Sequence, residues 1–344
     1  MRRGSPGDPA PMYVTRENHS MEVEPMRADA MRAALPLAGL GLLGVLASPG
    51  SSEEGSQNPV RLGLVGLDTS HVVVFTAAFN DPANADHVPG VKVVAAYKGG
   101  SRDIESSWSR VEGYAQELHE KWGVELVDSI EELCTKVDGV LIESVDGRPH
   151  LDQARPVIAA GLPFFVDKPV AGTLADGIEM ARLAQEKSVP WFGGSSLRWY
   201  AGVREAVDPE TVGEIIGCDA YSPCTTEPHH PDLFWYGTHG VSILYAAMGR
   251  GCKTVTRIAT ADTDVVVGVW GDGRIGTYRG TRSGAHDYGA TVFGTKAVAT
   301  ARGVSYRGLL EQIVRFFQTK EPPVPAEELL EELAFMEAAD RSKA

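Results

Sequence analysis

Short apolar runs alternate with helical patterns between residues 60 and 167, and this alternation constrains the fold more than any other feature of the sequence. The runs LGLVGL (62–67), VKVVAAY (91–97), GVLIES (139–144) and PFFVD (163–167) are mostly apolar. Strands that are covered on both faces have this composition, because neither face meets water. The segments between the runs have helical spacing, so the pattern predicts an α/β fold with a doubly wound parallel sheet of the Rossmann type.

A second domain is expected where this alternation ends. Residues 173–188 have a helical pattern, with Thr173 as the N-cap and Asp176 in a capping box. From Gly213 onward strand patterns dominate, and Gly-Asp-Gly at 271–273 predicts a hairpin turn. We expect a large, mostly antiparallel open sheet there, which is a common surface for homo-oligomer formation. The expected organisation is a leader (1–57), a Rossmann-like dinucleotide-binding domain (58–172), an α/β substrate and oligomerisation domain (173–305) and C-terminal helices that pack back on the core (306–344).

The leader has its own composition. Residues 1–30 are polar, and residues 31–52 combine an arginine, an apolar core at about 33–47 and an end of small residues. This is the form of a secretory signal peptide, and it is too short and too rich in glycine for a stable membrane span. We therefore expect export to a bacterial periplasm. A low-complexity leader, or a start codon at Met26 or Met31, would explain the same residues.

The charge balance excludes some classes of partner. The 344 residues carry a formal net charge of −14 and contain no run of lysine or arginine. Nucleic acids and anionic membrane surfaces bind basic patches, so neither is expected as a partner. An uncharged small molecule such as a carbohydrate is compatible with this acidity.

The most specific motif is AAGLPFFVDKPVAGT (159–173), in which a helix end, a buried strand, acid-Lys-Pro and a capped helix follow one another. With the order of the two domains and WFGGSSLRWY (191–200), it resembles the Gfo/Idh/MocA family of sugar and inositol oxidoreductases from residue 59 to the end. The resemblance implies NAD or NADP as the cofactor, a small carbohydrate or polyol as the substrate, and hydride transfer at a secondary hydroxyl.

The resemblance also implies residue roles. Lys168 of acid-Lys-Pro would lie between nicotinamide and substrate, and His239 would be the general acid/base. Such a reaction needs a base of near-neutral pKa for the hydroxyl proton, and a partly desolvated lysine can polarise the oxygen. Alternatively, His239 is a packed interface residue and Lys168 a solvated lysine. The other implied contacts are Gly66, Asp68, Thr69, Ser70, His71, Lys98, Asp167 and Pro169 for the cofactor, and Arg198, Trp199, Trp235 and Tyr236 for the substrate.

The phosphate loop departs from the family pattern. Asp68 stands at a glycine position, and His71 stands where glycine or alanine is usual. A carboxylate about 4 Å from a phosphate charge costs on the order of 4 kcal/mol at an effective dielectric constant near 20. One hypothesis is that Asp68 caps the following helix and occupies its anion site. The other is that the hydroxyls of Thr69 and Ser70 bind the phosphates while Asp68 turns away.

The ribose position, after the second strand, also lacks the usual acid. Lys98, Ser101 and Arg102 would suit NADP better than NAD, although the segment also reads as a surface loop.

The usual partner of the catalytic histidine is missing as well. Trp235 stands where family members often carry an aspartate, and Asp232 is the nearby substitute. Weak metal-ligand candidates, by residue type alone, are Glu227, His229 and His230.

Two classes of function follow. The first is an NAD(P)-linked oxidoreductase that uses Lys168 and His239. The second is a cofactor-independent lyase, epimerase or hydrolase, with or without a metal, or a sugar-binding protein on the same scaffold. The altered loop and the predicted export favour absence of the cofactor, since a chain exported unfolded cannot carry a dinucleotide with it.

Overall fold

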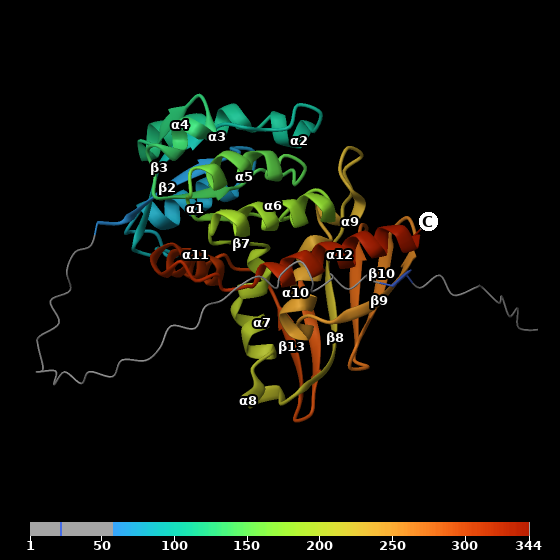
Figure 1. Ribbon diagram of the computed structural model, residues 1–344. Helices are drawn as coiled ribbons and strands as arrows, with labels where there is room; N and C mark the ends of the chain where they lie inside the picture. The colour runs from blue at the N-terminus through green and yellow to red at the C-terminus, as the bar shows by residue number, and fades with distance from the viewer. Residues whose placement is uncertain (1–20, 23–57, 344) are drawn as a thin grey trace, which may run out of the picture.

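The computed structural model describes residues 21–22 and 58–343. Two sheets form two layers, with the C-terminal helix running between them (Figure 1). The predicted leader and signal peptide lie outside the described residues, apart from the two-residue strand β1 (Met21–Glu22), which pairs with β9. Within the described residues, no helix combines the length and apolar composition needed to cross a bilayer.

The N-terminal sheet has six parallel strands, which confirms the predicted doubly wound fold. Its order is β4-β3-β2-β5-β6-β7, so the chain moves outward in one direction from β2 and in the other from β5. The carboxyl ends of these two central strands form the switch point at which such folds bind ligands. The strands are β2 (Val60–Val65), β3 (Val91–Tyr97), β4 (Glu125–Val127), β5 (Gly139–Ile142), β6 (Phe164–Val166) and β7 (Trp191–Gly193).

Helices cover both faces of this sheet. The predicted cap at Thr173 is confirmed, and Ser129 caps α4 in the same way. The segment between β3 and β4 forms two helices, interrupted at residues 109–110, and the second ends at Gly123 with φ +66°. The helices are α1 (His71–Asn80), α2 (Glu105–Trp108), α3 (Val111–Trp122), α4 (Ile130–Cys134), α5 (His150–Ala159) and α6 (Leu174–Lys187).

The parallel sheet runs past residue 172, where the sequence placed the domain boundary. β7 pairs with β6, and the rings of Phe164 and Trp191 stack with their centroids 5.7 Å apart. Helix α6 is therefore a crossover of the Rossmann layer rather than the start of the second domain.

The second sheet is mostly antiparallel, as predicted, with one parallel pair, β11 and β8. The Gly-Asp-Gly turn joins β10 to β11. The strands are β8 (Ile215–Pro223), β9 (Cys252–Ala259), β10 (Thr263–Trp270), β11 (Ile275–Thr281), β12 (Gly289–Gly294) and β13 (Val298–Arg302). The connecting helices are η2 (Ser196–Trp199), α7 (Ala201–Ala206), α8 (Pro209–Val212), α9 (Asp232–Trp235) and α10 (Thr238–Met248).

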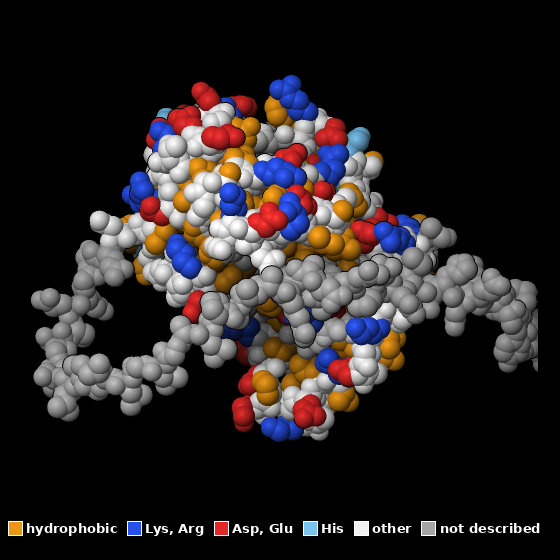
Figure 2. Space-filling view, viewed as in Figure 1, with side chains coloured by type: hydrophobic (Ala, Val, Ile, Leu, Met, Phe, Trp, Pro, Cys, Tyr) orange, Lys and Arg blue, Asp and Glu red, His pale blue; other side chains and the backbone are white. Residues whose placement is uncertain are grey.

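The last two helices pack on different layers. Helix α11 (Arg307–Thr319) buries Leu309, Ile313 and Phe316 against the apolar core of the parallel sheet. Helix α12 (Ala326–Lys343) contacts α6, α10 and β9, and so connects the two domains (Figure 1). On the face in Figure 2, acidic and basic side chains are interspersed over the Rossmann layer.

Candidate active site

A pocket of about 240 Å³ lies where the two domains meet. The Rossmann layer contributes the start of α1 and Lys168 to the pocket lining. The second domain contributes the turn between α9 and α10. Residues 304–306, which precede α11, also line the pocket. The lining residues are Thr69, Ser70, His71, Arg110, Val145, Lys168, Ser196, Leu197, Tyr236, His239, Tyr288, Val304, Ser305 and Tyr306.

Lys168 reaches this pocket from the carboxyl end of β6. It is 6% exposed, and its peptide bond to Pro169 is cis. Its Nζ lies 5.7 Å from the ring centroid of Tyr236, a cation–π contact between the two domains. The sequence thus placed this lysine at a strand end, and the domain arrangement buries it.

His239 enters the pocket from the first turn of α10. Its Nδ1 lies 2.8 Å from the hydroxyl oxygen of Ser195, which also accepts from the backbone nitrogen of Leu197. The rings of Tyr236 and Tyr288 meet the imidazole edge-on. Burial, and then the charge of Lys168, hold the pKa of His239 well below its usual value. The imidazole is therefore neutral at pH 7 and can accept a proton.

Asp232 does not replace the missing aspartate. Its carboxylate accepts hydrogen bonds from Arg257 of β9 and from Lys343 at the C-terminal end of α12. Asp232 does not line the pocket. The polar partner of His239 is the neutral Ser195. A hydroxyl orients the ring but supplies no negative charge to raise the pKa of the imidazole.

Asp68 is not the cap of helix α1, so that prediction is wrong. The N-cap residue is Ser70, which makes no side-chain capping bond. The Asp68 carboxylate accepts from Ser107 Oγ at 2.6 Å and from the backbone nitrogen of Val145 at 3.0 Å. It turns away from the helix because these two donors lie on other elements. Burial raises the pKa of Asp68, against the opposing effect of the two hydrogen bonds.

Gly66, which precedes this loop, permits the close approach of the loops after β2 and β5. Gly66 has φ +89°, and a Cβ there would lie 2.1 Å from Ser144 Oγ. The loop after β2 therefore lies directly against the loop after β5.

Three ionisable side chains meet below the pocket floor. His71 Nδ1 lies 2.6 Å from Asp167 Oδ2 and 4.0 Å from Glu143 Oε2. Burial, and then Asp167, raise the pKa of Glu143 well above its usual value. Burial is the largest effect on Asp167 and would raise its pKa too, but His71 and Lys168 together outweigh burial and the pKa is lowered.

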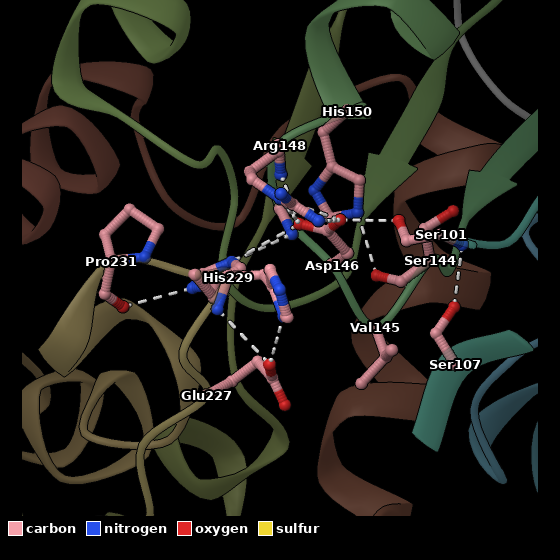
Figure 3. A network of polar contacts seen from close by, with 12 residues as sticks. Ser101, Ser107, Ser144, Val145, Asp146, Arg148, His150, Glu227, His229 and Pro231 are labelled. Carbon is pink, nitrogen blue, oxygen red and sulfur yellow. Dashed lines mark hydrogen bonds and ion pairs between the residues drawn. The ribbon is translucent and has the colours of Figure 1, made fainter. Parts of the chain in front are cut away.

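A second polar network is centred on Asp146 and Arg148 (Figure 3). The Ser101 hydroxyl donates to Asp146, and Arg148 binds both Asp146 and Asp103. The backbone nitrogen of Gly147 donates to His230 Nε2 at 3.2 Å. This network connects the segment after β3, the loop after β5 and the second domain.

The remaining predicted contacts lie elsewhere. Lys98 pairs with Glu112 at 2.7 Å, and Arg102 covers the ring of Trp108. Arg198 binds Glu328 and Glu332 of α12, because its guanidinium is buried and needs negative partners. Of the predicted substrate residues, Tyr236 lines the pocket, whereas Arg198, Trp199 and Trp235 are absent from its lining.

The weak metal candidates separate. Glu227 Oε1 contacts His229 Nδ1 at 3.0 Å on the exposed side of their loop. His230 turns the other way, toward Asp146 and Gly147, and the ring of Trp235 packs on it.

Sequence reasoning missed several residues of this site, among them four with polar side chains that enter the argument. Glu143 ends an apolar strand, which is a detectable anomaly, and Ser195 lies within the quoted WFGGSSLRWY motif. Tyr288 and Tyr306 line the pocket from segments without any motif.

Comparison with known proteins shows what the chain is similar to. Residues 61–194 match the model of the GFO_IDH_MocA family, described as an oxidoreductase family with an NAD-binding Rossmann fold. The Salmonella typhimurium protein YceM, which carries the name of an oxidoreductase, is 25% identical over 126 residues, which are 37% of this chain and 41% of YceM. An uncharacterized oxidoreductase of Streptococcus pneumoniae is 26% identical over 129 residues, or 34% of that protein. The match therefore spans less than half of each relative.

Solved structures share the fold over most of the chain. The scyllo-inositol dehydrogenase of Lactobacillus casei with bound NAD(H) and scyllo-inositol has a TM-score of 0.67 at 15% identity, covering 83% of this chain and 97% of that one. GenD2 of gentamicin A biosynthesis, in complex with NAD, has a TM-score of 0.65 at 19% identity, covering 87% and 97%.

Proposed function

Because the chain belongs to the Gfo/Idh/MocA family of NAD(P)-dependent oxidoreductases, we propose that it is an enzyme acting at a secondary hydroxyl of a carbohydrate or polyol. One observation carries this proposal: Lys168 from one domain and His239 from the other line the same pocket. The inositol dehydrogenases among the similar structures support a polyol as the substrate class.

The residues of this chain support proton transfer at that hydroxyl. Neutral His239 accepts the hydroxyl proton, and the ammonium of Lys168 orients the oxygen and stabilises the negative charge that develops on it. The hydroxyls of Ser70, Tyr236 and Tyr288 also line the pocket and can donate to and accept from a polyhydroxylated ring. Burial excludes bulk water, which strengthens each of these interactions.

The phosphate-binding side fits a dinucleotide poorly. In a Rossmann fold the pyrophosphate lies at the first helix N-terminus, over the switch point. Here the Asp68 carboxylate is buried beside that position, bound to Val145 and Ser107, and its negative charge would repel the phosphates. The family supports NAD(P) as the hydride acceptor. Hydride transfer needs a bound dinucleotide, however, and the charge of Asp68 opposes the binding of its phosphates. We therefore assign only the proton-transfer step to the chain.

A cofactor-independent reaction is the second candidate, and the position of Asp68 favours it. A lyase or epimerase acting on a carbohydrate needs a base and an acid within one pocket, which Lys168 and His239 provide. The export predicted from the leader favours the same reading.

The test uses the purified full chain and a panel of inositols and aldoses. Each compound is incubated in D₂O with NAD⁺, with NADP⁺ and without either, while nicotinamide reduction is followed optically and the sugar by NMR. Reduced nicotinamide supports the oxidoreductase. Deuterium incorporation or a new product without dinucleotide supports the second candidate.

The variant His239→Ala should lose either activity by about 100-fold or more. The control His119→Ala, on α3 away from the pocket, should keep it. No change in any compound under any condition would refute both candidates, and full activity of His239→Ala would remove His239 from the site.

A further inference from the structure

The cluster of His71, Glu143 and Asp167 is not explained by the proposed proton chemistry. One ligand-type atom from each residue lies within 4.8 Å of the other two. Glu143 and Asp167 are 0% exposed, and His71 is 7% exposed. The three come from different elements: the start of α1, the end of β5 and the end of β6.

Three carboxylate oxygens in this cluster lack donors. Among the described residues, neither Oε1 nor Oε2 of Glu143 has a hydrogen-bond partner, and Asp167 Oδ1 has none either. Buried polar atoms are nearly always satisfied, and an unpaired buried carboxylate is costly. The Glu143 carboxylate points toward His71, where a further positive group would satisfy it.

We propose that His71, Glu143 and Asp167 bind a divalent transition-metal ion, Mn²⁺ or Zn²⁺, below the floor of the pocket. One imidazole nitrogen and two carboxylates form a mixed nitrogen and oxygen donor set, which suits these ions better than Mg²⁺ or Ca²⁺. Two positive charges would balance the two carboxylates.

The surroundings suit an ion that also meets a ligand. The ring of His71 is held by Phe75, stacked at 5.2 Å, and by Tyr306, edge-on at 5.0 Å, so its orientation is set by packing. His71 is also part of the pocket lining. Three protein ligands leave coordination positions open on the pocket side, as in catalytic metal sites. A sugar hydroxyl that occupied one would be polarised beside Lys168.

The site uses one of the two positions at which the phosphate loop departs from its family. His71 stands where the loop usually has glycine or alanine, and a glycine there would offer no ligand. The metal site does not depend on the proposed function, because binding is measured without sugar or dinucleotide and can succeed or fail by itself.

The test is metal binding by the purified full chain. Chelator-treated protein is dialysed against Mn²⁺ or Zn²⁺, and bound metal is determined by mass spectrometry together with the metal-induced shift in melting temperature. We expect one ion per chain. Glu143→Gln and His71→Gln should each weaken binding tenfold or more and abolish the shift.

Two further measurements separate binding from folding. Metal-free Glu143→Gln should melt at or above the temperature of metal-free wild type, because burial disfavours a charged side chain at this position and glutamine keeps the shape without the charge. The control Glu227→Gln changes the carboxylate that contacts His229, outside the proposed site. It should bind metal as wild type does. Absence of stoichiometric metal in wild type, unchanged affinity in Glu143→Gln, or loss of binding in Glu227→Gln would overturn the proposal.

Discussion

The Asp68 carboxylate accepts a hydrogen bond from the backbone nitrogen of Val145 at 3.0 Å, and this contact joins the loops after β2 and β5 across the switch point of the sheet. Ser107 Oγ donates to the other oxygen of the same carboxylate. A buried carboxylate of the protein thus lies beside the switch point, where folds of this type bind their ligands.

Asp68→Gly should increase the affinity for NAD⁺ or NADP⁺ by tenfold or more. The substitution removes a charge whose repulsion at about 4 Å is on the order of 4 kcal/mol for an effective dielectric constant of 20. It also frees the Val145 nitrogen to donate. Calorimetric titration of both proteins measures the change. The control Ser107→Ala keeps the carboxylate and should not increase affinity, and equal affinity of Asp68→Gly and wild type would show that the carboxylate does not block the site.

Lys168→Met should lower kcat/KM at least 100-fold and should shift the acidic limb of the pH–rate profile to higher pH. The charge of Lys168 is one cause of the low pKa of His239, so its removal raises that pKa. A base acts when deprotonated, so the wild-type rate should fall only as the pH drops well below 6.5. The variant should lose its remaining activity earlier on acidification. A rate loss without this shift would mean that the two groups are not coupled.

Stability should decrease as the pH falls below about 6.5, partly because of His230. Its Nε2 accepts from Gly147 and its Nδ1 donates to the carbonyl of Pro231, an arrangement that requires the neutral ring. Burial lowers the pKa of His230 in the folded protein. The unfolded chain therefore takes up the proton first, and each such histidine costs at most about 1.4 kcal/mol of unfolding free energy per pH unit.

Urea denaturation at pH 7 and pH 5 measures this dependence. His230→Gln should reduce the loss of stability between the two values. An identical loss in His230→Gln and wild type would assign the effect to other groups.

The sequence suggests assembly of copies of the chain through the second sheet, which is a proposal. The strands of this sheet carry exposed apolar side chains that would form the contact. Ile216, Ile258, Ile275 and Val298 are each more than half exposed. Ile275→Asp should convert the oligomer to a smaller species in light scattering coupled to gel filtration, because the charge would be buried at the contact. Ile178→Asp on α6 is the control. A monomeric wild type, or an unaffected variant, would exclude this surface.

The local features were readable from the sequence because short-range chemistry decides them. The apolar runs of the Rossmann layer are buried strands, Ser129 and Thr173 cap their helices, and Gly-Asp-Gly makes the hairpin. Each depends on a few neighbouring residues. Lys168 could also be assigned to the end of a buried strand, since acid-Lys-Pro follows PFFVD directly.

Relationships between distant segments required the tertiary structure. Asp68 reads as a helix cap from its neighbours, yet its donors are 39 and 77 residues away. Arg198 reads as a substrate ligand, but α12 supplies two carboxylates that bind it. Sequence spacing carries no information about which of several acceptors a long or charged side chain will meet.

By itself, the sequence determined the fold class, the order of the domains and the positions of Lys168 and His239. Only the tertiary structure decided that Ser195 partners His239 and that His71, Glu143 and Asp167 gather below the pocket. The reason is physical: periodic burial and capping act within a few residues along the chain, whereas a site forms where strand ends and helix starts from 71 to 239 converge, and that convergence is set by the packing of whole layers.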